Sequence, residues 1–134
     1  MKEMKDCDLI VKAAAPCDYK PSVFSGNKIK SSELTVSFSK NKDIAAEVGR
    51  IKGDKKLVVF SAETENLLEN ARNKLLKKNA DLVVANDVTQ EGAGFLTDTN
   101  KVYILDRKGV VAETPVMSKS EVADVILDCA AEIL

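Results

Sequence analysis

Two lysines one helical turn apart, Lys74 and Lys78, are the clearest chemical feature of the sequence. They lie in a segment, 63–79, whose apolar residues recur at helical spacing: Leu68, Ala71 and Leu75. Residues four apart share one face of a helix, so the two ammonium groups repel each other slightly. Either they form a solvated face, which is the commoner case, or they bind a phosphate-rich ligand.

A strand–helix–strand unit frames these lysines. The apolar runs 57–60 and 82–85 have the length and β-branched character of buried strands, and a turn is expected at 61–64. Strands joined through a helix are parallel, and parallel sheets bind ligands beyond the carboxyl ends of their strands. The sequence therefore predicts a functional edge that contains Phe60, Glu63, Asn86 and Asp87.

The composition excludes several classes of function. The 134 residues contain no histidine and carry a net charge of −1. Ser-His-Asp and Cys-His catalysis cannot be built from this chain, and a zinc site would lack a local ligand cluster. The charge balance gives no support to binding of nucleic acid or of a membrane surface. Any chemistry must use lysines, carboxylates, amides and backbone dipoles.

The cysteines and the amino-terminal residues indicate the compartment. Cys7, Cys17 and Cys129 are odd in number and show no CxxC spacing, which favours reduced thiols. The first residues are mostly charged and resemble no signal peptide, and no apolar run is long enough to cross a bilayer. We therefore expect a cytoplasmic protein.

The remaining pattern predicts one α/β domain over 1–134. A strand is expected at 8–15, a turn-rich segment at 16–21 and a basic polar loop at 22–32. Residues 33–38 alternate between apolar and polar, which predicts a half-buried strand at an edge or in an arm. The later elements are a loop at 88–100, a β-hairpin of 101–106 and 110–114, and a last helix with a capping box at Ser118–Glu121.

A short helix is expected between the arm and the strand–helix–strand unit. Asn41 can cap it, and Asp43 in its first turn is favoured by the helix dipole. Its apolar positions fit an amphipathic helix that ends near Gly53: Ile44, Ala45, Val48 and Ile51.

Several segments together resemble one known family. AAAPCDYKP, at 13–21, is similar to the AAAVADYRP segment of bacterial phosphopantothenate–cysteine ligase, the synthetase half of the bifunctional coenzyme A biosynthesis protein of the Dfp family. NKIK at 27–30 resembles the family's KIKK, and KNKDI at 40–44 its KNPDI. FSAET at 60–64 resembles GFAAET, and the segment from Ala85 resembles ANDV…GF…D.N.V. These motifs come in family order and at family spacing over nearly the whole chain.

The resemblance implies a fold and a reaction. The expected fold is an incomplete Rossmann-like sheet with helices on both faces, an extended arm and a β-hairpin. The family joins 4'-phosphopantothenate to L-cysteine. In the family's reaction, the carboxylate of 4'-phosphopantothenate attacks the α-phosphate of CTP to give an acyl-cytidylate and pyrophosphate. The amine of cysteine then displaces CMP. Such a mechanism needs positioning and charge neutralisation rather than a histidine.

The resemblance also implies the site. Lys28 is expected to be catalytic, in a loop that closes over the nucleotide. Nucleotide contacts are expected at the following positions: Asp18, Lys28, Asn41, Lys42, Asp43, Ile44, Phe60, Lys74 and Lys78. A magnesium ion bridging the phosphates is expected, although no carboxylate pair identifies its ligands, and a homodimer is expected to pair partly through the arm at 27–38.

The chain departs from the family pattern at particular points. Ser31, Lys42 and Val59 stand where the family has lysine, proline and glycine. The family's glycine-rich start, the asparagine that engages the acyl group, and the FMN-binding decarboxylase domain have no counterpart here. We therefore expect the carboxyl-terminal portion of the ligase domain, inactive as a ligase by itself.

Two other functions stay open. A non-catalytic nucleotide-binding or oligomerisation module would leave Lys74 and Lys78 as a solvated face. An unrelated sugar- or dinucleotide-binding domain is disfavoured, because the chain contains no GxGxxG motif.

Overall fold

A five-stranded sheet is the centre of the computed structural model, which describes residues 3–87 and 97–134. Its spatial order is β1 (Leu9–Lys12), β4 (Lys56–Glu63), β5 (Leu82–Asp87), β7 (Val102–Leu105) and β8 (Val110–Glu113). β1, β4 and β5 are parallel, and β7 and β8 continue the sheet in antiparallel fashion. The α/β class expected from the sequence is confirmed.

The strand–helix–strand unit is confirmed as β4, α2 (Leu67–Lys77) and β5. The turn expected at 61–64 is wrong, because β4 continues to Glu63 and pairs with β5 as far as Asp87. The helix consequently begins at Leu67 rather than at Glu63. Leu67 packs on the core, whereas Leu68, expected on the apolar face, is 44% exposed.

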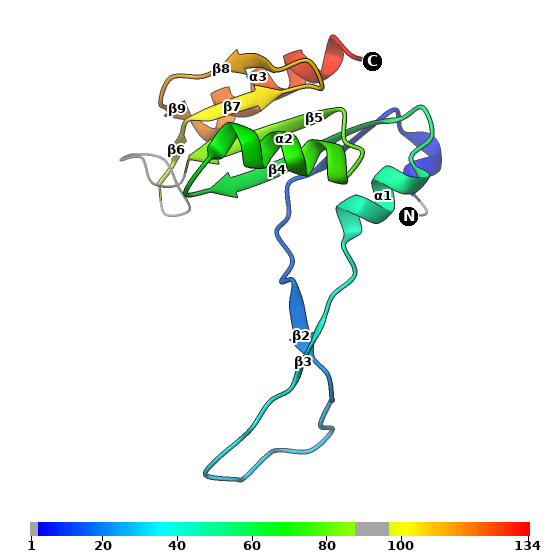
Figure 1. Cartoon of the computed structure of the whole chain (residues 1–134), viewed down its shortest axis with the longest axis vertical. Coiled ribbons are helices and arrows are strands. Elements are labelled where there is room, and N and C mark those ends of the chain that lie inside the picture. The colour runs from blue at the N-terminus through cyan, green and yellow to red at the C-terminus, as the bar shows by residue number, and fades with distance from the viewer. Residues whose placement is uncertain (1–2, 88–96) are drawn as a thin grey trace.

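Helices cover both faces of the sheet (Figure 1). α1 (Ile44–Ile51) and α2 pack on one face, and their core includes Val48, Leu57, Val59 and Leu75. α3 (Lys119–Ala131) packs on the other face, where its residues Val122, Ile126 and Ala130 are buried against the sheet. Each fully buried aliphatic side chain stabilises the fold by about 1.5–3 kcal/mol. The sheet is therefore packed between two hydrophobic cores, one on each face.

Local sequence signals explain the ends of several elements. The capping box of α3 is present as expected, with Ser118 accepting from the Glu121 amide and the Glu121 carboxylate accepting from the Ser118 amide. The β7–β8 hairpin is also confirmed, and the Asp106 side chain accepts from the amides of Lys108 and Gly109 in its turn. Asp43, not Asn41, is the N-cap of α1 and accepts from the Ala46 amide.

A long arm, residues 13–42, leaves the body after β1 and returns to α1 (Figure 1). Its only described strands are the short antiparallel pair β2 (Tyr19–Pro21) and β3 (Phe38–Lys40). The half-buried strand expected at 33–38 is therefore wrong, and the first strand ends at Lys12 instead of 15. Leu34 and Phe38 are each 61% exposed, because the arm projects away from both cores.

Short elements complete the described part of the chain. They are a 3-10 helix at Glu3–Asp6 and the strands β6 (Thr99–Asn100) and β9 (Met117–Ser118), which pair with each other. Most of the loop expected at 88–100 lies outside the described residues. Across 3–87 and 97–134, no helix combines the length and the apolar character that crossing a bilayer requires.

The carboxyl end of α2 lies directly against α1. A Cβ atom added at Gly49 would overlap the backbone carbonyl of Lys78, so only glycine allows this approach. Asn79 follows in the left-handed conformation with φ of 48°. Its side-chain amide donates to the Gly49 carbonyl at 2.9 Å and accepts from Arg107 at 2.6 Å.

Gly49→Ala tests this contact. Alanine normally stabilises a helix interior relative to glycine by about 0.5–1 kcal/mol. Here we expect a loss of about 1–3 kcal/mol in the free energy of unfolding, because the added methyl group overlaps backbone that cannot move freely. Urea denaturation followed by circular dichroism measures the change. Gly26→Ala is the control, since a Cβ there meets nothing within 4 Å, and equal stability of both variants would contradict the prediction.

Candidate functional site

An ion pair joins the start of α1 to the end of α2. One carboxylate oxygen of Asp43 caps α1, and the other pairs with the ammonium group of Lys78. Asp43 is 41% exposed in its side chain and Lys78 only 16%. The Asp43 carboxylate thus holds both the start of α1 and the side chain of Lys78, a residue expected to bind the nucleotide.

The base of the arm closes beside this ion pair. The Asn41 amide group donates to the Cys17 carbonyl at 2.7 Å, and the Asn41 backbone N–H donates to the Asp18 carbonyl at 2.7 Å. These two bonds clamp the outgoing and returning chains together. Asn41 therefore holds the base of the arm together and does not cap α1, whose N-cap is Asp43.

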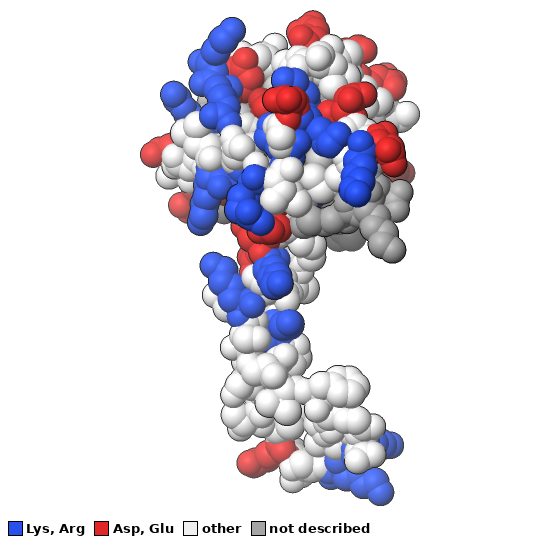
Figure 2. Space-filling model, turned by 90° about the vertical axis from the view of Figure 1, so that its right-hand side faces the viewer, with Lys and Arg blue, Asp and Glu red and all other residues white. Residues whose placement is uncertain are grey.

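Several charges meet at this junction of arm and body. Burial lowers the pKa of Lys78, and the positive charges of Lys12 and Lys40 lower it further, whereas the Asp18 carboxylate opposes the shift. Figure 2 shows basic side chains gathered where the arm leaves the body, with acidic ones beside them. A pKa lowered in this way marks an ammonium group that an incoming anion would stabilise.

A hollow of about 360 Å³ runs along α2 from the end of β4 to the junction. Its lining is polar and mostly basic or amide in character: Glu63, Asn70, Asn73, Lys74, Lys77 and Lys78. Lys74 pairs with Glu63 at 3.3 Å. Glu63 also accepts from the Ser61 hydroxyl at 2.5 Å and from the Asn70 amide at 3.4 Å. Lys74 and Lys78 therefore line the same polar hollow, together with Lys77.

Other expected site residues lie elsewhere. Phe60 packs with the α3 core, on the opposite face of the sheet from Lys74 and Lys78, so its ring does not face their hollow. Lys28 lies in the arm between β2 and β3 and is exposed. Lys42 and Ile44 flank the Asp43 cap and are exposed. Asn86, at the carboxyl edge, accepts from the Asn100 amide at 2.8 Å.

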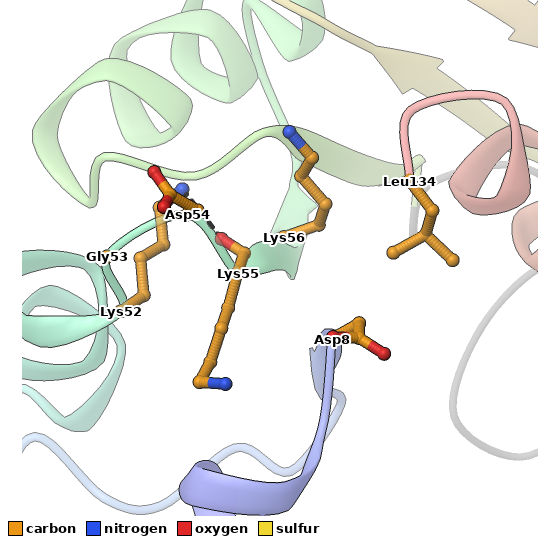
Figure 3. Close-up of a pocket in the computed structure, with 7 residues that line it drawn as sticks. All are labelled: Asp8, Lys52, Gly53, Asp54, Lys55, Lys56 and Leu134. Carbon is orange, nitrogen blue, oxygen red and sulfur yellow. Dashed lines mark hydrogen bonds between the residues drawn. The ribbon is translucent and has the colours of Figure 1, made fainter.

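A second hollow lies at the opposite, amino edge of the sheet (Figure 3). It measures about 610 Å³, and its lining residues are Asp8, Lys52, Gly53, Asp54, Lys55, Lys56 and Leu134. The buried Lys52 donates to Asp81 at 2.7 Å and to the Lys55 carbonyl at 3.0 Å, and Lys55 donates to the Cys7 carbonyl at 2.7 Å. Figure 3 shows the Lys55 and Lys56 side chains pointing away from each other. Lys52 and Lys55 are thus partnered within the fold, as Lys74 and Lys78 also are. The lysines expected to bind the nucleotide line the hollow along α2 and not this one, so we take the junction as the candidate site.

Lys12 and Lys40 were not among the site residues predicted from the sequence. Lys12 ends a strand and Lys40 ends the returning side of the arm, so their meeting with Lys78 depends on tertiary structure. The available signal was the position of Lys12 at the carboxyl end of a parallel strand. Within the described part of the chain, no group of three or more Asp, Glu, Cys or His residues converges to hold a metal ion.

Comparisons with known proteins agree with the family that the motifs resemble. The model of the DNA/pantothenate metabolism flavoprotein C-terminal domain matches residues 1–134. The coenzyme A biosynthesis bifunctional protein CoaBC of Bacillus subtilis (strain 168) is 42% identical over 122 residues, which cover 90% of this chain and 30% of that protein. A cysteine/cysteine sulfinic acid decarboxylase from an unknown prokaryotic organism is 36% identical over 126 residues, 92% of this chain and 35% of that protein.

A solved structure gives the same result. The crystal structure of the C-terminal domain of a coenzyme A biosynthesis bifunctional protein CoaBC superposes with a TM-score of 0.77 at 34% identity, and covers 98% of this chain and 59% of that one. The chain spans about a third of the length of the two curated relatives.

Two substitutions separate the roles of the Asp43 carboxylate. Asp43→Asn keeps an oxygen that caps α1 but loses the charge that pairs with Lys78, whereas Asp43→Ala loses both. We expect the alanine variant to lose about 0.5–2 kcal/mol of unfolding free energy, the usual value of an N-cap, and the asparagine variant to lose only a few tenths. Urea denaturation measures both. Equal losses would show that the ion pair, not the cap, dominates.

Proposed function

Because the chain belongs to the family of DNA/pantothenate metabolism flavoprotein C-terminal domains, we propose that it is the nucleotide-binding part of a phosphopantothenate–cysteine ligase in coenzyme A biosynthesis. The name of its Bacillus subtilis relative supports the pathway. The reaction would join 4'-phosphopantothenate and L-cysteine at the expense of CTP.

The observation that carries this proposal is the cation-rich junction between the arm and α2. Lys74 and Lys78 lie one turn apart along one hollow, which corresponds to about 6 Å along the helix axis. Asp43 and Asn41 hold the second of these lysines and the base of the arm in place. An elongated polyanion such as a nucleoside triphosphate fits this linear arrangement of charge better than a compact anion does.

The proposed chemistry divides into two displacements. The carboxylate of 4'-phosphopantothenate attacks the α-phosphorus of CTP, the bond to the β-phosphate bridging oxygen breaks, and pyrophosphate leaves. The cysteine amine then attacks the acyl carbon, loses a proton and releases CMP. Lys74 and Lys78 would neutralise the charge that develops on the departing pyrophosphate. No step requires a histidine, which this chain lacks.

The donor set fits a magnesium ion held mainly by the nucleotide. The described residues form no carboxylate cluster of three or more groups, and magnesium commonly binds through substrate phosphates, waters and one or two carboxylates. Asp18 and Asp43 are the carboxylates at the junction that could take this part. Bound magnesium would supply additional positive charge at the phosphates.

The outer arm and Phe60 have separate proposed roles. We propose that Lys28 acts when the arm is brought over a nucleotide site, and that pairing of two chains through their arms places it there. The exposed apolar side chains of the arm support such pairing: Tyr19, Val23, Phe24, Leu34 and Phe38. Phe60 would contact the base through its backbone, since its ring belongs to the α3 core.

Nucleotide titration of the 134-residue chain tests the proposal. Backbone amide resonances are followed by NMR while CTP, and separately ATP, is added with magnesium. We expect shifts at Asp18, Asn41–Ile44 and Lys74–Lys78, stronger with CTP. Replacing Lys74 and Lys78 together by methionine should weaken CTP binding about 10-fold or more, because charge-assisted contacts to phosphate are lost.

Arg72→Met is the matched control. Arg72 is an exposed cation on the same helix and does not line the hollow, so we expect unchanged affinity. If the double variant binds CTP as tightly as the unaltered chain, the lysines form a solvated face. The alternative of a non-catalytic assembly module would then be favoured.

A further inference from the structure

Lys12 ends β1 on the same face of the sheet as the nucleotide hollow. Side chains alternate along β1: Leu9 packs with the α3 core and Ile10 with the α1–α2 core. Lys12 therefore faces the α1–α2 side, as does its register partner Val59. It is half-buried at the point where the chain leaves the sheet for the arm.

The Lys12 ammonium group lies near that of Lys78. Lys12 is the largest electrostatic contributor to the lowered pKa of Lys78, ahead of Asp18 and Lys40. Lys12 and Lys78 come from β1 and the end of α2, so they approach the junction from the sheet and from the helix layer above it. Two cations from different layers thus act on each other at the junction.

Lys12 has no carboxylate partner among the described residues. The five ion pairs found there join other groups. Lys52 shows what a structural lysine looks like in this chain, since it is buried, pairs with Asp81 and donates to a backbone carbonyl. Lys12 is also half-buried, but no such partner is found for it among the described residues.

We propose that Lys12 is a third phosphate-binding lysine, which contacts the polyphosphate of the nucleotide from the sheet side while Lys74 and Lys78 contact it from α2. This inference rests on the proposed function and adds a residue to it. The charges support it, because Lys12, Lys40 and Lys78 outnumber the carboxylates Asp18 and Asp43 at the junction. Lysine binds phosphate as a compact point charge that needs no fixed geometry.

Calorimetric titration of the 134-residue chain with magnesium and either CTP or CMP tests the assignment. Lys12→Met should raise the Kd for CTP about 10-fold and the Kd for CMP less than about 3-fold, because the lost contact is to the outer phosphates. Lys12→Arg keeps the charge and should stay within about 3-fold of the unaltered chain for CTP. Lys56→Met is the matched control, a half-buried lysine at the opposite edge of the same sheet, and should change neither affinity.

Each outcome decides the matter. Equal weakening of CTP and CMP binding by Lys12→Met, or no weakening, overturns the assignment. If the unaltered chain does not bind CTP, the proposed function is contradicted. The titrations are then repeated with inorganic tripolyphosphate in place of the nucleotide. Tripolyphosphate binding that Lys12→Met weakens and Lys12→Arg retains would support the phosphate-binding role alone. Absence of tripolyphosphate binding would overturn the assignment as well.

Discussion

The close approach of α1 to the carboxyl end of α2 is the constraint on which the rest of the site depends. It exists because Gly49 leaves room for the Lys78 carbonyl, and the Asn79 side chain bridges the same two helices. Helix α1 thereby brings its cap, Asp43, against the Lys78 side chain. The base of the arm is attached to that cap, so one tight backbone contact sets the positions of the arm, the cap and the lysine together.

Electrostatics at the junction are balanced differently from those at the amino edge of the sheet. There Lys52 and Asp81 form a satisfied buried pair, and Asp81 also accepts from the Leu57 amide. At the junction, Lys78 shares its carboxylate with a helix cap, and its neighbour Lys12 has no carboxylate partner among the described residues. The first arrangement stabilises the fold alone, whereas the second leaves positive charge that a ligand can neutralise.

The sequence predicted those features that depend on neighbours in the chain. The strand–helix–strand unit, the β7–β8 hairpin and the α3 capping box follow from local periodicity and turn residues, and they are confirmed. The alternating segment 33–38 failed, because alternation shows that a strand has two different faces and not that anything covers one of them. The side on which Phe60 lies, and the meeting of Lys12 with Lys78, depend on which helix covers which face. No single segment contains that information.

Because of the clamp at the base of the arm, the stability of the body depends little on the length of the arm. Asn41 ties the returning chain to Cys17 and Asp18, so the outgoing and returning segments of the arm are joined where they meet the body. The entropy of closing a flexible loop grows only slowly, by about 0.6 kcal/mol for each doubling of its length. Residues 22–37 contribute no buried side chain to either core. Insertions, deletions and substitutions beyond the clamp would therefore be tolerated by folding, and selection on that segment would act through what it touches rather than through stability.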